Sequence, residues 1–128
     1  MGNGTNLGRV RGLGSAKAGA HHWWLQRVTA AANLFLVPWF VFSLIRLPNL
    51  SHGIVVDWLS SPLVAVAMIL LSANAFWHLR LGLQVVIEDY VHNESSKLGV
   101  LILLNFFAIG GAAIAIFSIA KIAFGGAA

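Results

Sequence analysis

Hydrophobic positions along the chain gather in three long runs, at residues 28–47, 62–87 and 98–124, and the polar residues lie mainly between them. Each run reaches the roughly 20 residues that a helix needs to cross about 30 Å of hydrocarbon. Because lipid cannot hydrogen-bond the backbone, such runs must cross it as helices. The pattern predicts an all-α membrane protein with three transmembrane helices, over about residues 23–47, 62–90 and 97–124.

Helix-breaking residues set the boundaries of these helices. LPNLSHG at residues 47–53 and SSP at residues 60–62 bound the first connection. Pro38 lies inside the first run and predicts a kink there. The second run would measure about 39 Å at a rise of roughly 1.5 Å per residue, so we expect it to tilt or to project beyond the bilayer.

The first 20 residues have a different composition. They contain six glycines, Arg9, Arg11 and Lys17, and no acidic residue. Few apolar side chains are present to offset the entropy of ordering, which predicts a flexible basic N-terminal arm over residues 1–20, followed by a three-helix membrane anchor over residues 21–128. An organelle transit segment is a second interpretation, which the glycine content disfavours.

Composition supports a membrane protein. Hydrophobic residues make up 59% of the chain and charged residues 9%, and the mean hydropathy is +0.83, far from the values of a soluble domain. The chain has no cysteine, which excludes disulfides, iron–sulfur ligation and a c-type haem attached to this chain. The basic residues are scattered through an apolar sequence, so we expect the lipid bilayer as a partner and no nucleic acid.

The distribution of basic residues predicts the orientation. One side of the membrane receives Arg9, Arg11, Lys17, Arg27 and Lys97, and the other side receives Arg46 and Lys121. Positive charge is retained on the cytoplasmic side. We therefore expect the N-terminus to face the cytoplasm in a bacterial inner membrane, with the mitochondrial inner membrane as the less favoured location.

The second run carries polar groups that are costly to place in lipid. At about 100° per residue, one face of its helix collects five positions: Asn74, His78, Gly82, Val85 and Asp89. Gly82 leaves room on that face for a flat ligand or a second backbone. Arg80 and Gln84 point elsewhere, and we expect them to pair with neighbouring subunits, backbone carbonyls or headgroups.

His78 is the candidate ligand of a cofactor. An ionisable residue within a membrane span usually marks a relay, a pathway or a cofactor, although a hydrogen-bonded filler is the alternative. A proton relay or transport subunit would need several titrating groups, whereas a neutral imidazole beside a glycine suits an axial haem ligand. His21, His22, His52 and His92 are expected in flanks or loops. A haem would therefore be shared with a partner subunit.

The second helix is predicted to end on Glu88, Asp89 and Tyr90. Acids at a helix C-terminus oppose the helix dipole, which indicates another reason for their presence. A phenol beside a carboxylate at the membrane surface could polarise a quinone carbonyl and supply protons; a solvated helix end is the equal alternative. In the third helix, small residues four apart (Ala108 with Ala112, Gly111 with Ala115) predict close helix packing.

Two segments resemble a known family. HHWWLQRVTAAANL at residues 21–34, and His78 followed by GLQVVIEDYV at residues 82–91, are similar to the small hydrophobic membrane anchor of succinate dehydrogenase, a cytochrome b-type anchor chain of respiratory complex II. The resemblance covers residues 12–92. Its most specific element is a histidine twelve residues before the tyrosine of an Asp-Tyr pair, with a glycine four residues after the histidine.

The resemblance implies a non-catalytic anchor chain that joins a second cytochrome b-type anchor and carries the iron–sulfur and flavoprotein subunits. It implies that His78 is an axial ligand of haem b, that Arg27 contacts a haem propionate, that Tyr90 hydrogen-bonds ubiquinone, and that Asp89 lies beside the quinone. Arg27 is equally interpretable as a positive-inside anchor. The alternatives are a purely structural anchor and a fumarate reductase-type anchor without quinone contacts of its own.

Overall fold

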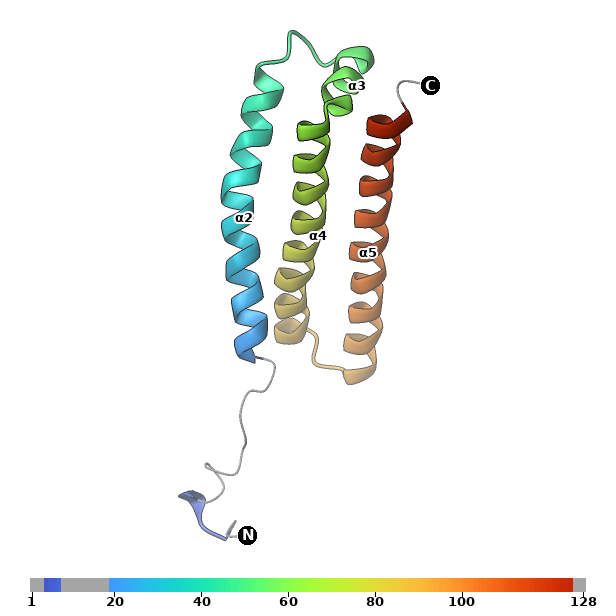
Figure 1. Cartoon of the computed structure of the whole chain (residues 1–128). Coiled ribbons are helices and arrows are strands. Elements are labelled where there is room, and N and C mark those ends of the chain that lie inside the picture. The colour runs from blue at the N-terminus through green and yellow to red at the C-terminus, as the bar shows by residue number, and fades with distance from the viewer. Residues whose placement is uncertain (1–3, 8–18, 126–128) are drawn as a thin grey trace.

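The computed structural model describes residues 4–7 and 19–125, and three long helices dominate it (Figure 1). They are α2 (Gly19–Ile45), α4 (Pro62–Tyr90) and α5 (Glu94–Gly125), and a short helix α3 (His52–Ser60) connects the first two. Each long helix has the length and hydropathy of a membrane span, and the described residues contain no strand. The predicted fold class is confirmed. Most of the predicted arm lies outside the described residues.

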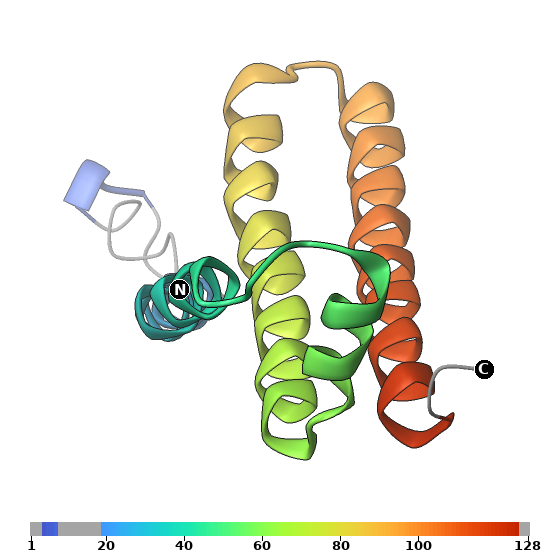
Figure 2. The ribbon, with the colours of Figure 1, turned by 90° about the horizontal axis from the view of Figure 1, so that it is seen from above.

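The helix α4 is the centre of the arrangement. It packs against α5 on one side and α2 on the other, and α3 packs against α4 and α5. Figure 2 shows α4 and α5 side by side along their lengths, while α2 is seen nearly end-on. Among the described residues, the backbones of α2 and α5 do not approach each other closely. Most of the surface of α2 is therefore available to lipid or to another chain.

Three helix ends lie a few residues from their predicted positions. The helix α2 begins at Gly19 instead of residue 23, and local chemistry accounts for the other two. The helix α2 stops at Ile45, short of the predicted end at residue 47, because Pro48 disfavours helical backbone at Leu47. The helix α5 begins at Glu94 instead of residue 97. There the side-chain oxygen of Asn93 accepts a hydrogen bond from the backbone N–H of Ser96 at 3.0 Å, which is the action of an N-cap.

The helix α3 was not predicted, because its nine residues lie between two breaker segments that indicated only a connection. Its own Val56 is buried. Trp58 stacks on Trp39 of α2, with ring centroids 6.2 Å apart. This contact ties the connection to the end of α2. The helix α2 continues through Pro38, and the kink predicted there stays a prediction.

The small residues of α5 permit close packing on α4, as predicted. Ala108 is buried, and a Cβ built on Gly111 would lie 2.5 Å from a ring carbon of Phe76 on α4. The Phe76 ring also meets Phe107 edge-on, with centroids 6.2 Å apart. The α4–α5 pair is thus a tight unit that holds α4 and the polar residues it carries.

Candidate functional site

His78 lies in the middle of α4, half-buried and directed at α2. Its Nδ1 atom is 2.9 Å from the hydroxyl oxygen of Thr29. Thr29 is 7% exposed and is the one buried polar residue in the described part of the chain. The part of the predicted polar face that carries Asn74 and His78 is therefore turned toward the first helix, where a threonine meets the histidine.

Asn74, one turn before His78, makes the second polar contact between the two helices. Its amide nitrogen donates to the backbone oxygen of Thr29 at 2.8 Å and to the side-chain oxygen of Asn33 at 2.7 Å. We call Thr29, Asn33, Asn74 and His78 the polar clamp. Since lipid offers no competing hydrogen bonds, these contacts fix how α2 and α4 meet.

Gly82 borders open space, one turn after His78 on the same face. A Cβ built on it would meet no atom of a described residue within 4 Å. No described residue hydrogen-bonds the Nε2 atom of His78 either. A neutral imidazole with one bound nitrogen and one open nitrogen, next to a glycine, fits the needs of an axial haem ligand.

The remaining histidines lie at helix ends. His21 and His22 lie in the first turn of α2, His52 begins the connecting helix α3, and His92 follows α4, so all four flank the apolar runs as expected. The described residues contain no group of three or more possible metal-ligating side chains. A haem iron takes at most two axial ligands, one on each face, so a single histidine of a chain can serve as one of them.

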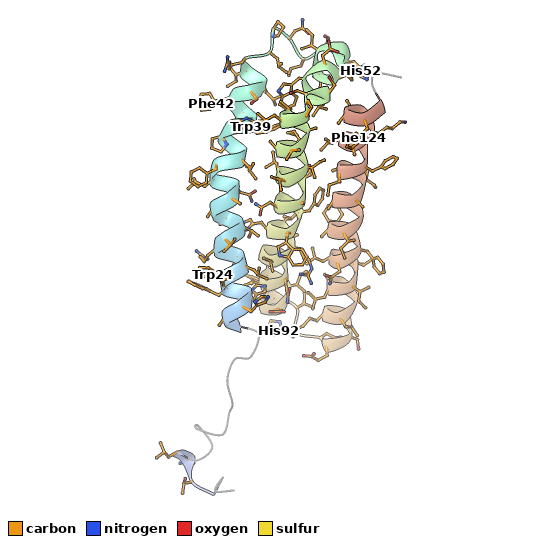
Figure 3. All side chains as sticks on the ribbon, in the orientation of Figure 1. Trp24, Trp39, Phe42, His52, His92 and Phe124 are labelled. Atoms are coloured by element: carbon orange, nitrogen blue, oxygen red, sulfur yellow. The ribbon has the colours of Figure 1, made fainter. Side chains whose placement is uncertain are left out.

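Asp89 and Tyr90 lie at the end of α4 and are exposed. The Tyr90 side chain is 78% exposed, and its phenol bonds to no described residue. Glu88 accepts a hydrogen bond from Gln84 one turn earlier, at 2.9 Å. Figure 3 shows His92, two residues after Tyr90, at the same end of the bundle as Trp24 of α2, while His52 and Phe124 lie at the other end. The phenol is therefore free for an external acceptor near one interface.

Arg27 is separate from this group. It is exposed, and its guanidinium lies 5.8 Å from the centroid of the Trp23 ring. At about 100° per residue it points about 160° around α2 from Thr29. Among the described residues, no contact joins Arg27 to Asp89 or Tyr90. The described part of this chain thus forms the polar clamp by itself but does not bring Arg27 to the end of α4.

Arg80 points away from His78 as expected, but the expected kind of partner was wrong. Its Nε donates to the side-chain oxygen of Asn105 on α5, so its partner is a side chain of its own chain, and its guanidinium lies 5.0 Å from the Trp77 ring centroid. Asn105 in turn donates to the backbone oxygen of Leu101 at 2.7 Å. Gln84 likewise pairs within the chain. The structure assigns Arg80 to the α4–α5 contact.

Sequence reasoning did not single out Thr29, Asn33 and Asn105. A usable signal was present, because Thr29 and Asn33 are four residues apart and so share one face of the first helix. Asn105 is an isolated amide in the middle of the third apolar run. In a membrane span such residues usually face another helix.

Comparison with known proteins places the chain in a family. The model of the succinate dehydrogenase/fumarate reductase transmembrane subunit matches residues 1–113. The succinate dehydrogenase hydrophobic membrane anchor subunit of Rickettsia bellii is 31% identical over 101 residues, 79% of this chain and 81% of that protein. The succinate dehydrogenase membrane anchor subunit of Reclinomonas americana is 31% identical over 96 residues, 73% of this chain and 80% of that protein.

A third relative extends the match along more of the chain. The succinate dehydrogenase hydrophobic membrane anchor subunit of Paracoccus denitrificans is 27% identical over 116 residues, which cover 91% of this chain and 89% of that protein. No solved structure gives a significant match. Since the family model spans α2, α4 and most of α5, the chain belongs to the succinate dehydrogenase/fumarate reductase transmembrane subunit family.

Proposed function

We propose that this multi-pass chain is an anchor of succinate:quinone oxidoreductase. It docks the flavoprotein and iron–sulfur subunits at the membrane, shares one haem b with a second cytochrome b-type anchor, and helps to form the ubiquinone reduction site. The family match and the curated relatives support the anchor role. The observation that carries the haem assignment is the mid-span imidazole of His78, bound through Nδ1 and bordered by the space at Gly82.

His78 would hold the haem iron from one side, and a histidine of the partner anchor would complete the coordination. The described part of this chain offers no second histidine in mid-span, which supports a shared haem. When bound, the haem would take up and release single electrons. The polar clamp keeps the imidazole in place, because Thr29 holds the ring and Asn74 holds the backbone of Thr29.

Tyr90 would donate a hydrogen bond to a ubiquinone carbonyl, and Asp89 would lie beside it as part of the proton route. The exposure of both side chains and the unpaired Tyr90 phenol support this role. Arg27 would contact a haem propionate from the exposed side of α2. Because that side faces away from Thr29, the contact would form on a surface that α4 does not cover.

The orientation follows from charge. Arg27 and Lys97 lie toward the end of the bundle that carries Tyr90, and excess positive charge is retained on the cytoplasmic side. We infer that the N-terminus and the quinone site face the cytoplasm of a bacterium, with the chain in the inner membrane.

The haem assignment is tested by His78→Leu in the assembled complex. We expect the b-type band in the reduced-minus-oxidised absorption spectrum to disappear. His52→Leu, at the opposite end of the bundle, is the matched control and should keep the band. A normal band in a fully assembled His78→Leu complex would remove His78 from the iron.

The quinone assignment is tested by Tyr90→Phe, which keeps the ring and removes the hydroxyl. Losing one hydrogen bond that forms at the reacting carbonyl should lower ubiquinone reduction about tenfold or more. Succinate oxidation with a soluble dye as acceptor should be unchanged. Wild-type ubiquinone reduction by the variant would favour the alternative, in which this chain is a purely structural anchor.

A further inference from the structure

We infer that Thr29 is a positioning residue that keeps a proton on Nδ1 of His78 and so leaves the lone pair of Nε2 free for iron. The inference rests on the proposed haem function. It concerns a different residue and a different property, namely which imidazole nitrogen carries the proton and how strongly the ring donates electrons.

The hydrogen-bond geometry around the Thr29 hydroxyl supports this assignment. The hydroxyl oxygen lies 2.8 Å from the backbone oxygen of Leu25, 3.2 Å from that of Gln26 and 2.9 Å from Nδ1 of His78. A hydroxyl has one proton, and a carbonyl oxygen can only accept. Without a proton between them, two oxygens 2.8 Å apart would place lone pair against lone pair. The hydroxyl proton therefore points to Leu25, and His78 is the donor to Thr29.

The surroundings of Thr29 keep this arrangement in place. The residue is 7% exposed, so no water can replace the contact within the span. Asn74 donates to the backbone oxygen of Thr29 at 2.8 Å, which holds the α2 backbone against α4. The branched threonine side chain also has few rotamers in a helix. The hydroxyl oxygen is thus a fixed acceptor, and the imidazole tautomer follows from it.

This tautomer has a chemical consequence at the metal. The nitrogen opposite a protonated Nδ1 is the one that binds a metal, and a hydrogen bond from Nδ1–H makes the ring a stronger donor. A stronger donor stabilises ferric iron over ferrous iron. Thr29 would therefore lower the midpoint potential of the haem without touching it.

The experiment compares three variants of the complete complex. Thr29→Val keeps the shape and removes the hydroxyl, and Thr29→Ser keeps the hydroxyl. Ser72→Ala is the matched control, because the Ser72 hydroxyl makes the same backward bond to a helix carbonyl, to Met68 at 2.8 Å, and no bond from Ser72 to another helix occurs in the described residues. The readouts are haem content, haem midpoint potential and the low-spin signals of the ferric haem in electron paramagnetic resonance.

We expect Thr29→Val to raise the haem potential and shift the ferric signals. At a fixed ambient potential its ratio of reduced to oxidised haem should rise about threefold to tenfold, the effect of one hydrogen bond near a metal ligand. A tenfold change corresponds to about 59 mV for one electron. Thr29→Ser and Ser72→Ala should match the wild type. Loss of haem in Thr29→Val alone would also support the inference.

Three results would overturn the inference. One is a haem-loaded Thr29→Val complex with wild-type potential and signals. Another is an equal shift or equal haem loss in Thr29→Val and Thr29→Ser, which would assign the effect to packing. The third is a shift of the same size in Ser72→Ala. Failure of the proposed function itself is distinguishable, because it would appear as a b-type band that survives His78→Leu.

Discussion

Replacing Gly111 by alanine should weaken the contact between α4 and α5. The added Cβ would lie 2.5, 2.8 and 3.3 Å from three ring carbons of Phe76, all closer than an ordinary contact of about 3.4 Å. The ring would have to move by about 0.9 Å, the difference between 3.4 Å and the shortest of these distances. Its path is restricted, because Phe107 packs against it at a centroid distance of 6.2 Å.

The cost of this substitution can be separated from the change in helix propensity. Forcing one extra methyl group into a close-packed contact typically costs about 1–3 kcal/mol. Exchanging glycine for alanine in a helix favours the helix by up to about 1 kcal/mol. Gly110 supplies the control, since a Cβ there would lie more than 4 Å from every described neighbour outside its own helix backbone. Gly110→Ala should therefore be neutral or slightly stabilising, and Gly111→Ala should be less stable than Gly110→Ala by about 1–3 kcal/mol.

The measurement is thermal unfolding of the detergent-solubilised complex, followed through release of this chain. At roughly 3 °C per kcal/mol, Gly111→Ala should release about 3–9 °C below Gly110→Ala. Adding Phe76→Leu to Gly111→Ala should recover part of the loss, because the smaller side chain makes room for the methyl group. Equal release temperatures for the two alanine variants would refute the proposed contact, as would a double variant less stable than the sum of its two single changes.

Three further predictions concern the polar contacts and the open face. Asn74→Leu removes both hydrogen bonds that the Asn74 side chain donates in the polar clamp. At roughly 0.6 kcal/mol per hydrogen bond, the α2–α4 contact should lose about 1 kcal/mol, which would be measured as a lower release temperature. Asn105→Ala should cost about 1–3 kcal/mol because it leaves the Arg80 guanidinium without its amide acceptor, and adding Arg80→Leu should recover most of that loss in the same measurement. Gly82→Val should abolish haem incorporation, measured as haem per complex, although a Cβ at this position meets no atom of a described residue within 4 Å, whereas Gly99→Val on α5 should leave haem content unchanged.

The lengths of the apolar runs were sufficient to predict three spans, because crossing the bilayer sets a minimum helix length that the sequence either meets or does not. The ends were less predictable, because they depend on single side chains. The Asn93 cap lets α5 begin at Glu94, three residues before the predicted start at residue 97. Pro48 ends α2 at Ile45, before the predicted end. The short helix α3 has no such length signal, and its position depends on packing against α4 and α5.

The candidate site was predictable within one helix and less so between helices. Spacing in the second run identified the face with Asn74 and His78, because residues four apart share a helix face. Spacing cannot say which helix that face meets, so Thr29 and Asn33 were missed as partners. The same limitation made the expectation for Arg80 wrong. The predicted roles at the quinone and the haem propionate stay predictions, because those contacts involve groups outside this chain.

Polar atoms, more than apolar ones, indicate where a membrane chain meets its partners. An exposed leucine or phenylalanine on α2 is as stable against lipid as against another apolar side chain. The many exposed apolar side chains of this chain therefore give no information about an interface. A polar atom without a partner in the span costs free energy until something satisfies it. Among the described residues, Nε2 of His78 in mid-span is such a group, and Nε2 of His22 is a buried unpaired atom at the start of α2. His78 is also the residue that the family resemblance assigns to haem iron, so the cost of leaving its Nε2 unpaired in lipid is itself an argument that a ligand or a partner chain completes it.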